Sequence, residues 1–166
     1  MSDFTHVRAE GGVHMVDVSA KSETLRTAVA MGSVILGAEA FERVRENTIQ
    51  KGDVLSIAQI AGIMGAKETA RLIPLCHQVQ IQGVDVSLTL DSNAHAVHIR
   101  AFAKSQGPTG VEMEALTAVS IAALTVYDMC KSITKDLRID GIHLLAKTGG
   151  ASGDYLRTEV VVEETA

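Results

Sequence analysis

The sequence predicts an α+β fold: an antiparallel sheet with helices packed on one face, in a ferredoxin-like arrangement. The segments follow one another as strand, helix, helix, strand, strand, helix and strand, an order typical of this fold class. Between Val84 and Asp91 apolar and polar residues alternate, as expected in an antiparallel sheet with one buried face. The chain is long enough for a single domain, 1–166. Two polar, Gly-rich stretches, 1–13 and 147–155, are expected to be mobile.

The first half of the chain contains one predicted strand and two predicted helices. Residues 24–36 are rich in Val, Ile and Thr and predict a strand that Gly37 ends. A short helix is predicted over 38–46. A longer helix begins after Asp53, which can cap it, and ends before Pro74. Apolar residues recur in it at helical spacing, namely Ile57, Ile60, Ala61 and Met64.

The second half contains a predicted hairpin and one long helix. A turn at 91–93 joins strand 84–91 to a return strand around 97–101. The loop 107–110 then leads into a mostly apolar helix of about twenty residues that runs to Lys131. Two further strands are predicted over 138–146 and 156–162.

Composition excludes several functional classes. Only 3% of the residues are aromatic, so the core must be aliphatic, and Met64, Met113 and Met129 are expected to fill it. The net charge of −5 argues against a broad nucleic-acid surface. The two cysteines form no Cys-x-x-Cys pair, and no metal site is predicted. The start lacks a signal peptide, and the apolar helix holds Asp128, so we expect a core helix, no membrane and a cytoplasmic protein.

The long helix carries charges at both ends. Glu112 and Glu114 lie in its first turn, where the helix dipole favours acids. Asp128 and Lys131 are three residues apart and share a face. They form either an ordinary helix-end ion pair or a general acid/base pair, and the spacing alone favours the ion pair. Glu114 and Asp128 are about 21 Å apart along the helix, so a site that uses both ends must be shared between subunits.

Other candidate residues lie in loops. Leu75, Cys76 and His77 follow a proline turn and can line a pocket, although a lone His is more often structural. Lys51 and Lys147 each adjoin glycines in segments that loosely resemble phosphate-binding loops. Neither segment matches a P-loop, and each on its own is more often an ordinary turn.

Several long motifs, in order, resemble the cyclic pyranopterin monophosphate synthase family, also called molybdenum cofactor biosynthesis protein C. The resemblance covers nearly the whole chain. The motifs are His14–Lys21, Lys51–Val54, Leu72–His77, Thr109–Thr117 and Tyr127–Lys131, followed by Lys147 with Gly149 and Gly150. The chain departs from the family pattern at Gln78, where Pro is usual, and at Thr148, where Ser is frequent.

The resemblance implies a lyase of molybdenum cofactor biosynthesis. Its substrate would be (8S)-3',8-cyclo-7,8-dihydroguanosine 5'-triphosphate, and its products cyclic pyranopterin monophosphate and diphosphate. It implies that Asp128 is the active-site acid, with Lys131 as a further functional residue. Substrate-contacting or functional residues by resemblance are Leu75, Cys76, His77, Met113, Glu114, Glu112, Lys51 and Lys147. It also implies a homohexamer, a trimer of dimers, with sites at subunit interfaces. The sequence requires no cofactor, and Mg²⁺ could accompany the triphosphate.

Two other classes of function stay open at this point. A nucleotide-sensing protein could share the pocket without turnover, although anion binding alone does not need an acid among lysines. A structural assembly subunit could use the same motifs for interface packing. Release of diphosphate from the substrate distinguishes the enzyme from the sensing protein. The structural subunit instead predicts that charge-neutral substitutions of Lys51 and Lys147 disrupt assembly and not catalysis.

Overall fold

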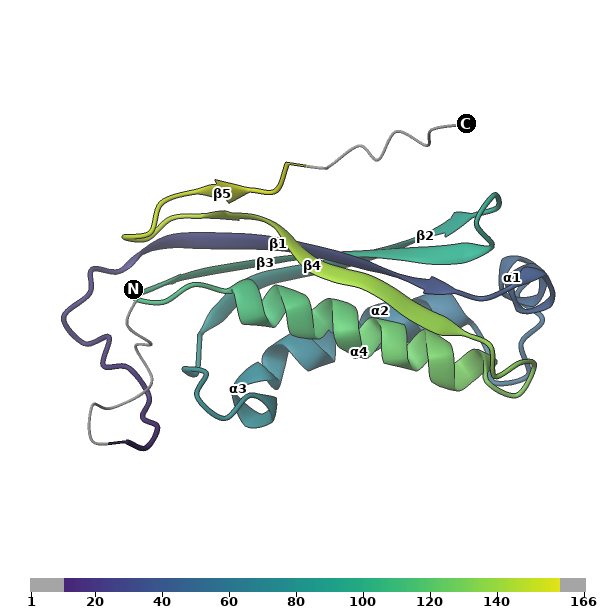
Figure 1. Cartoon of the computed structure of the whole chain (residues 1–166), viewed down its shortest axis with the longest axis horizontal. Helices are drawn as coiled ribbons and strands as arrows, with labels where there is room; N and C mark the ends of the chain where they lie inside the picture. The colour runs from purple at the N-terminus through teal and green to yellow at the C-terminus, as the bar shows by residue number, and fades with distance from the viewer. Residues whose placement is uncertain (1–10, 159–166) are drawn as a thin grey trace.

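The computed structural model describes residues 11–158 and shows one sheet with a helical layer beneath it (Figure 1). The elements follow in the order β1 (Thr24–Ile35), α1 (Ala38–Arg45), α2 (Val54–Lys67), α3 (Thr69–Leu72), β2 (Ile81–Asp91), β3 (Ala96–Gly107), α4 (Glu112–Cys130), β4 (Arg138–Thr148) and β5 (Tyr155–Leu156). The strand order is β2-β3-β1-β4-β5, and every neighbouring pair is antiparallel. The first four of these strands have the ferredoxin-like order, so the predicted α+β class is confirmed.

Local signals explain where the elements begin and end. The side chain of Asp53 accepts a hydrogen bond from the Ser56 amide at 3.1 Å and caps α2, as predicted. Asp91 accepts from the amides of Asn93 and Ala94 at 2.8 and 3.1 Å, which shapes the turn between β2 and β3. Both hairpin strands are longer than predicted because the pairing continues from Ile81 to Ser105, beyond the alternating segment.

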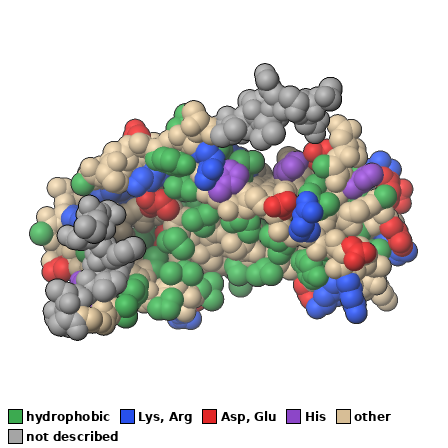
Figure 2. Space-filling view, viewed as in Figure 1, with side chains coloured by type: hydrophobic (Ala, Val, Ile, Leu, Met, Phe, Trp, Pro, Cys, Tyr) green, Lys and Arg blue, Asp and Glu red, His purple; other side chains and the backbone are tan. Residues whose placement is uncertain are grey.

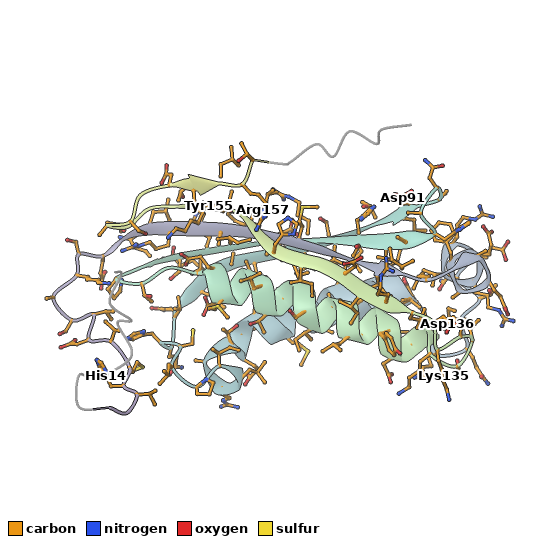
Figure 3. The ribbon with its side chains drawn as sticks, viewed as in Figure 1. His14, Asp91, Lys135, Asp136, Tyr155 and Arg157 are labelled. Atoms are coloured by element: carbon orange, nitrogen blue, oxygen red, sulfur yellow. The ribbon has the colours of Figure 1, made fainter. Side chains whose placement is uncertain are left out.

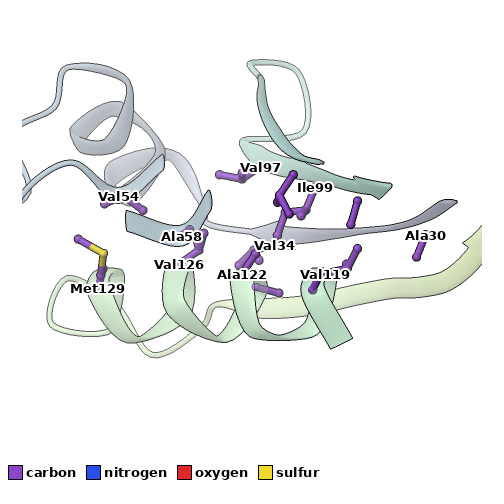
Figure 4. Close-up of a cluster of buried hydrophobic side chains, with 14 of the residues drawn as sticks. Ala30, Val34, Val54, Ala58, Val97, Ile99, Val119, Ala122, Val126 and Met129 are labelled. Atoms are coloured by element: carbon purple, nitrogen blue, oxygen red, sulfur yellow. The ribbon is translucent and has the colours of Figure 1, made fainter. Parts of the chain in front are cut away.

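Small residues bring the layers close together. The core between α4 and the sheet is rich in alanine and valine (Figure 4). A Cβ on Gly62 would lie 2.9 Å from the Ala118 carbonyl oxygen, and one on Gly65 would lie 2.7 Å from Ile121. Helices α2 and α4 therefore pack through a glycine contact that larger side chains would prevent. By length and composition α4 could cross a membrane, but 56% of its apolar window is buried inside the protein, and it is the central core helix here.

Two expectations about the helices were wrong. Met64, which was expected to fill the core, is 60% exposed, and Ile57 and Ile60 on the same helix are 41% and 59% exposed, because α2 turns its small residues toward α4. Met113 is also partly exposed, at 36%, whereas Met129 is buried as expected. A large apolar surface is therefore left on the outside of the helical layer, and Figure 2 shows hydrophobic side chains along that side of the molecule.

The C-terminal segment also differs from its predicted form. Lys147 and Thr148 belong to β4, and the side chains of Thr148 and Thr27 form a hydrogen bond at 2.6 Å. After a short turn, Tyr155 and Leu156 form β5 against β4. The predicted strand 156–162 thus begins one residue earlier and is two residues long where the chain is described, and residues 159–162 lie outside the described range. The predicted mobile arm, 1–13, lies mostly outside it too.

Candidate active site

A cavity of about 540 Å³ lies at the N-terminal end of α4. The loop after α3 forms one wall, and the residues that lead into α4 form the opposite wall. Five predicted site residues line it: Leu75, Cys76, His77, Glu112 and Met113. Val16, Val18 and Lys21 complete the lining from the N-terminal segment. The mixture of aliphatic walls and a few polar groups is typical of a pocket for a small organic ligand.

Hydrogen bonds hold the two walls in place. His77 Nε2 lies 2.7 Å from the Val16 carbonyl oxygen, so this nitrogen is the protonated donor. The Cys76 amide donates to the Ile73 carbonyl oxygen at 3.1 Å. On the opposite wall, a Cβ on Gly110 would overlap the Glu112 carboxylate. Glycine is therefore needed there for Glu112 to fold back toward the cavity.

Glu112 lines both this cavity and a second chamber of about 580 Å³, and Lys147 lines the second chamber. Lys147 Nζ lies 3.0 Å from Glu112 Oε1 and donates to Ser152 Oγ at 2.8 Å. Both charged side chains are mostly covered, at 21% and 29% exposed. The contact therefore connects β4, the loop after β4 and the first turn of α4 around one ion pair.

Glu114 lies behind the cavity wall and does not line it. The residue is 2% exposed, and its Oε2 has no hydrogen-bond partner. Burial, with a smaller contribution from the charge on Glu112, raises the pKa of Glu114 above its usual value. Burial together with the charges of Glu114 and Glu112 also raises the pKa of the Cys76 thiol. Cys76 therefore faces the cavity as a neutral thiol rather than a nucleophilic thiolate.

The second cluster lies at the other end of α4, around Asp128. Lys131 Nζ contacts Asp128 Oδ1 at 2.6 Å, and Lys51 Nζ contacts Oδ2 at 2.8 Å. Lys51 also donates to the Asp128 backbone carbonyl at 2.8 Å, where the helix dipole favours a cation. The hydrogen bonds from Lys131 and then Lys51 lower the pKa of Asp128 to about 2, so this carboxyl group is ionised at neutral pH.

The apolar sequence around Asp128 suggested a buried carboxylate at the helix end, but Asp128 is not buried. Its side chain is 56% exposed, because its position lies on the exposed face of α4. The predicted ion pair with Lys131 is present, and Lys51 is a second partner that spacing along the helix could not reveal. Lys51, Tyr127, Lys131, Ser132 and Lys135 line a shallow cavity of about 440 Å³ beside this cluster.

The structure thus separates the predicted residues into two groups. Glu112 and Asp128 are sixteen positions apart on one straight helix, or about 24 Å. Figure 3 shows Lys135 and Asp136 just beyond one end of α4 and His14 near the opposite end. The two groups of predicted site residues therefore lie at opposite ends of α4, and the fold of a single chain does not bring them together.

Sequence reasoning missed several residues that border these cavities. Lys21, Arg26 and Thr109 line the second chamber, and Lys135 borders the shallow one. Arg26 had a readable signal: it has the same strand parity as Ala28 and Ala30, which face the core, so a charge there is unusual. Lys135 lies in a polar turn and had none.

Comparison with known proteins assigns the family. The MoaC family model matches residues 15–150. The chain belongs to the MoaC family. It is 64% identical to the cyclic pyranopterin monophosphate synthase of Salinibacter ruber, over 93% of this chain and 91% of that protein. It is 54% identical to the synthase of Thermoanaerobacter sp. (strain X514), over 93% and 98%. It is also 52% identical to human molybdenum cofactor biosynthesis protein 1, over 93% of this chain and 24% of that protein.

Proposed function

We propose that this protein is a cyclic pyranopterin monophosphate synthase, a lyase of molybdenum cofactor biosynthesis. The observation that carries the proposal is the family match over residues 15–150, a range that includes all ten predicted site residues. Its substrate is (8S)-3',8-cyclo-7,8-dihydroguanosine 5'-triphosphate, which it rearranges to cyclic pyranopterin monophosphate with loss of diphosphate.

The charged groups suit the two parts of this reaction. Opening the purine ring and closing the pterin ring require proton transfers. The ionised Asp128 can accept a proton, and the ammonium groups of Lys51 and Lys131 can donate one. Formation of the cyclic phosphate requires a substrate hydroxyl to attack the first phosphorus while diphosphate leaves. That step depends on positioning and on cations that stabilise the phosphate charge.

We further propose that each complete site is built from two subunits of a homohexamer. The exposed face of α4 supports this, because its apolar residues are spaced symmetrically on either side of Ser120. Met113 and Tyr127 lie seven positions on either side of Ser120, and Leu116 and Leu124 lie four positions on either side. Leu124 is 55% exposed, and the exposed apolar residues of α2 lie alongside. Such a self-complementary surface is what a two-fold interface requires.

The same symmetry would complete the site. Glu112 and Asp128 are each eight positions from Ser120, about 12 Å along the helix. If two copies of α4 pack antiparallel about Ser120, Glu112 of one copy lies beside Asp128 of the other. Packed helices are 8–10 Å apart, so the cavity at Glu112 and the lysines around Asp128 would face one substrate. The trimeric arrangement of such dimers rests on the family resemblance.

The proposal includes no resident metal. Among residues 11–158, no three His, Cys, Asp or Glu side chains gather as a metal-binding set, and the lysines around both half-sites disfavour a cation. Mg²⁺ would instead enter bound to the triphosphate. We also propose that the protein acts in the cytoplasm, where its nucleotide-derived substrate would be made.

Incubation with the purified substrate tests the proposal. We expect diphosphate and the pterin product to form in equal amounts, with Asp128→Asn as the inactive control. Tight substrate binding without diphosphate release would favour a nucleotide-sensing protein. Failure to bind the substrate would favour a structural subunit.

A further inference from the structure

Arg26 is a buried cation with no acidic partner. The residue is 8% exposed and lies near the start of β1, on the face that carries the core alanines. Its Nε donates to the Gly107 carbonyl oxygen at 3.2 Å and its Nη2 to that of Pro108 at 3.3 Å. Within residues 11–158 it forms no salt bridge with any Asp or Glu. A guanidinium buried without a counter-charge destabilises the fold, so a merely structural role explains it poorly.

The position of Arg26 indicates where a counter-charge could bind. The side chain lines the second chamber together with Lys21, Lys147 and the loop residues Gly150 and Ser152. Lys147 already contacts Glu112 and Ser152, and Lys21 is exposed to solvent. Glu112 also lines this chamber, but its carboxylate pairs with Lys147. Arg26 is thus a buried cation of the chamber that pairs with no acidic side chain among residues 11–158.

The loop over Arg26 is shaped around the guanidinium. Gly150 has φ +91°, and a Cβ there would overlap Arg26 Nη1. The backbone can approach the guanidinium this closely only because the residue is glycine. The two carbonyl bonds fix the edge of the group formed by Nε and Nη2, whereas Nη1 lies against Gly150, which lines the chamber together with Arg26. A fixed planar donor of this kind is suited to phosphate oxygens.

We propose that Arg26 binds the phosphate chain of the substrate in the second chamber. This inference rests on the proposed function, because that function supplies a triphosphate, and it adds a residue and a chamber to the site. Since the same contact is available to released diphosphate, inorganic diphosphate is a direct probe that needs no turnover.

Calorimetric titration of the intact oligomer with inorganic diphosphate tests the inference. We expect Arg26→Met to weaken diphosphate binding at least tenfold and to reduce its dependence on salt concentration. Arg26→Lys should keep more affinity than Arg26→Met because it retains the charge. The matched control is Arg100→Met, an exposed arginine on β3 outside the chamber, which should bind as the unchanged protein does.

Several results would overturn the inference. One is unchanged diphosphate binding by Arg26→Met. Another is an equal loss of diphosphate affinity in the Met and Lys variants, which would indicate that Arg26 acts only through its contacts with the loop. The third is no diphosphate binding by the unchanged protein. If Arg26→Met does not fold, Arg26→Gln replaces it, because Gln keeps a donor for a loop carbonyl without the charge. Failure of the proposed function is distinct, because it would appear as no conversion of substrate by the unchanged protein, whatever the diphosphate titration gives.

Discussion

Two inactive variants should restore activity to each other if each site is shared between subunits. The perturbation is Glu112→Ala in one copy, which damages the half-site at the start of α4. The second is Asp128→Ala in another copy, which damages the half-site at its end. The two positions are about 24 Å apart on one helix, so neither substitution touches the other half-site of its own subunit.

The expected recovery follows from the symmetry. A shared site takes its Glu112 half from one subunit and its Asp128 half from the two-fold partner. In oligomers assembled at random from equal amounts of the variants, roughly a quarter of the sites receive both intact halves. Sites contained within single subunits would recover no activity, because every subunit carries one defect.

Co-expression of the two variants with different affinity tags, followed by purification through both tags, yields the mixed oligomers. Diphosphate release per site is then compared with that of the unchanged protein and of each variant alone. Activity near a quarter supports the shared site. Mixed oligomers that stay inactive would refute it, and so would recovery of activity by simple mixtures in which no subunits have exchanged.

Three further outcomes follow from the structure. Ser120→Arg should separate the α4 pairs, because it places a large charge at the proposed two-fold axis. Light scattering would then show smaller oligomers. The control is Thr89→Arg, which places an arginine at an exposed position of β2 and should leave the oligomers intact. Asp128→Asn should lower turnover about a hundredfold or more. The same substitution should also change stability, because the lysines lower the pKa of Asp128 to about 2. The ion pairs of Asp128 therefore stabilise the fold above pH 4, and this stabilisation is lost as the pH falls toward 2. Thermal melts of both proteins across this pH range measure the difference, and a constant difference would contradict the ion pairs. Glu114 has a raised pKa, so its buried carboxyl group destabilises the fold as the pH rises through that pKa. Glu114→Gln should therefore raise the melting temperature at pH 7 to 8 and lose this advantage in acid. A Glu114→Gln variant that is less stable than the unchanged protein at pH 8 would show that the charge is compensated.

The Lys51 contact changes how one variant should be read. As a phosphate-binding lysine alone, Lys51 would affect mainly substrate affinity. The structure places its ammonium group 2.8 Å from Asp128 Oδ2, so Lys51→Ala also removes one of the two lysine hydrogen bonds that lower the pKa of Asp128. Kinetic effects of Lys51 and Asp128 should therefore not be additive.

The sequence by itself determined the order of the strands and the longer helices, because that information is local, although it did not separate the short α3 from α2. The alternation in β2, the Asp53 cap and the turn at Asp91 act over a few residues, and the structure has all three. The charges at both ends of α4 were also evident from spacing. The family motifs predicted the site residues one by one, and these roles stay predictions, whereas membership of the family is confirmed.

Only the tertiary structure decided which side chains meet. The contacts of Lys51 with Asp128 and of Lys147 with Glu112 join residues far apart in the chain, so no local spacing could reveal them. The predicted core position of Met64 on α2 was wrong for a related reason. Ile57, Ile60 and Met64 have the helical spacing of a core face, but Gly62 and Gly65 permit the closer contact with α4. Close packing of the two backbones therefore decided which face of α2 was buried and left its larger apolar residues on the surface.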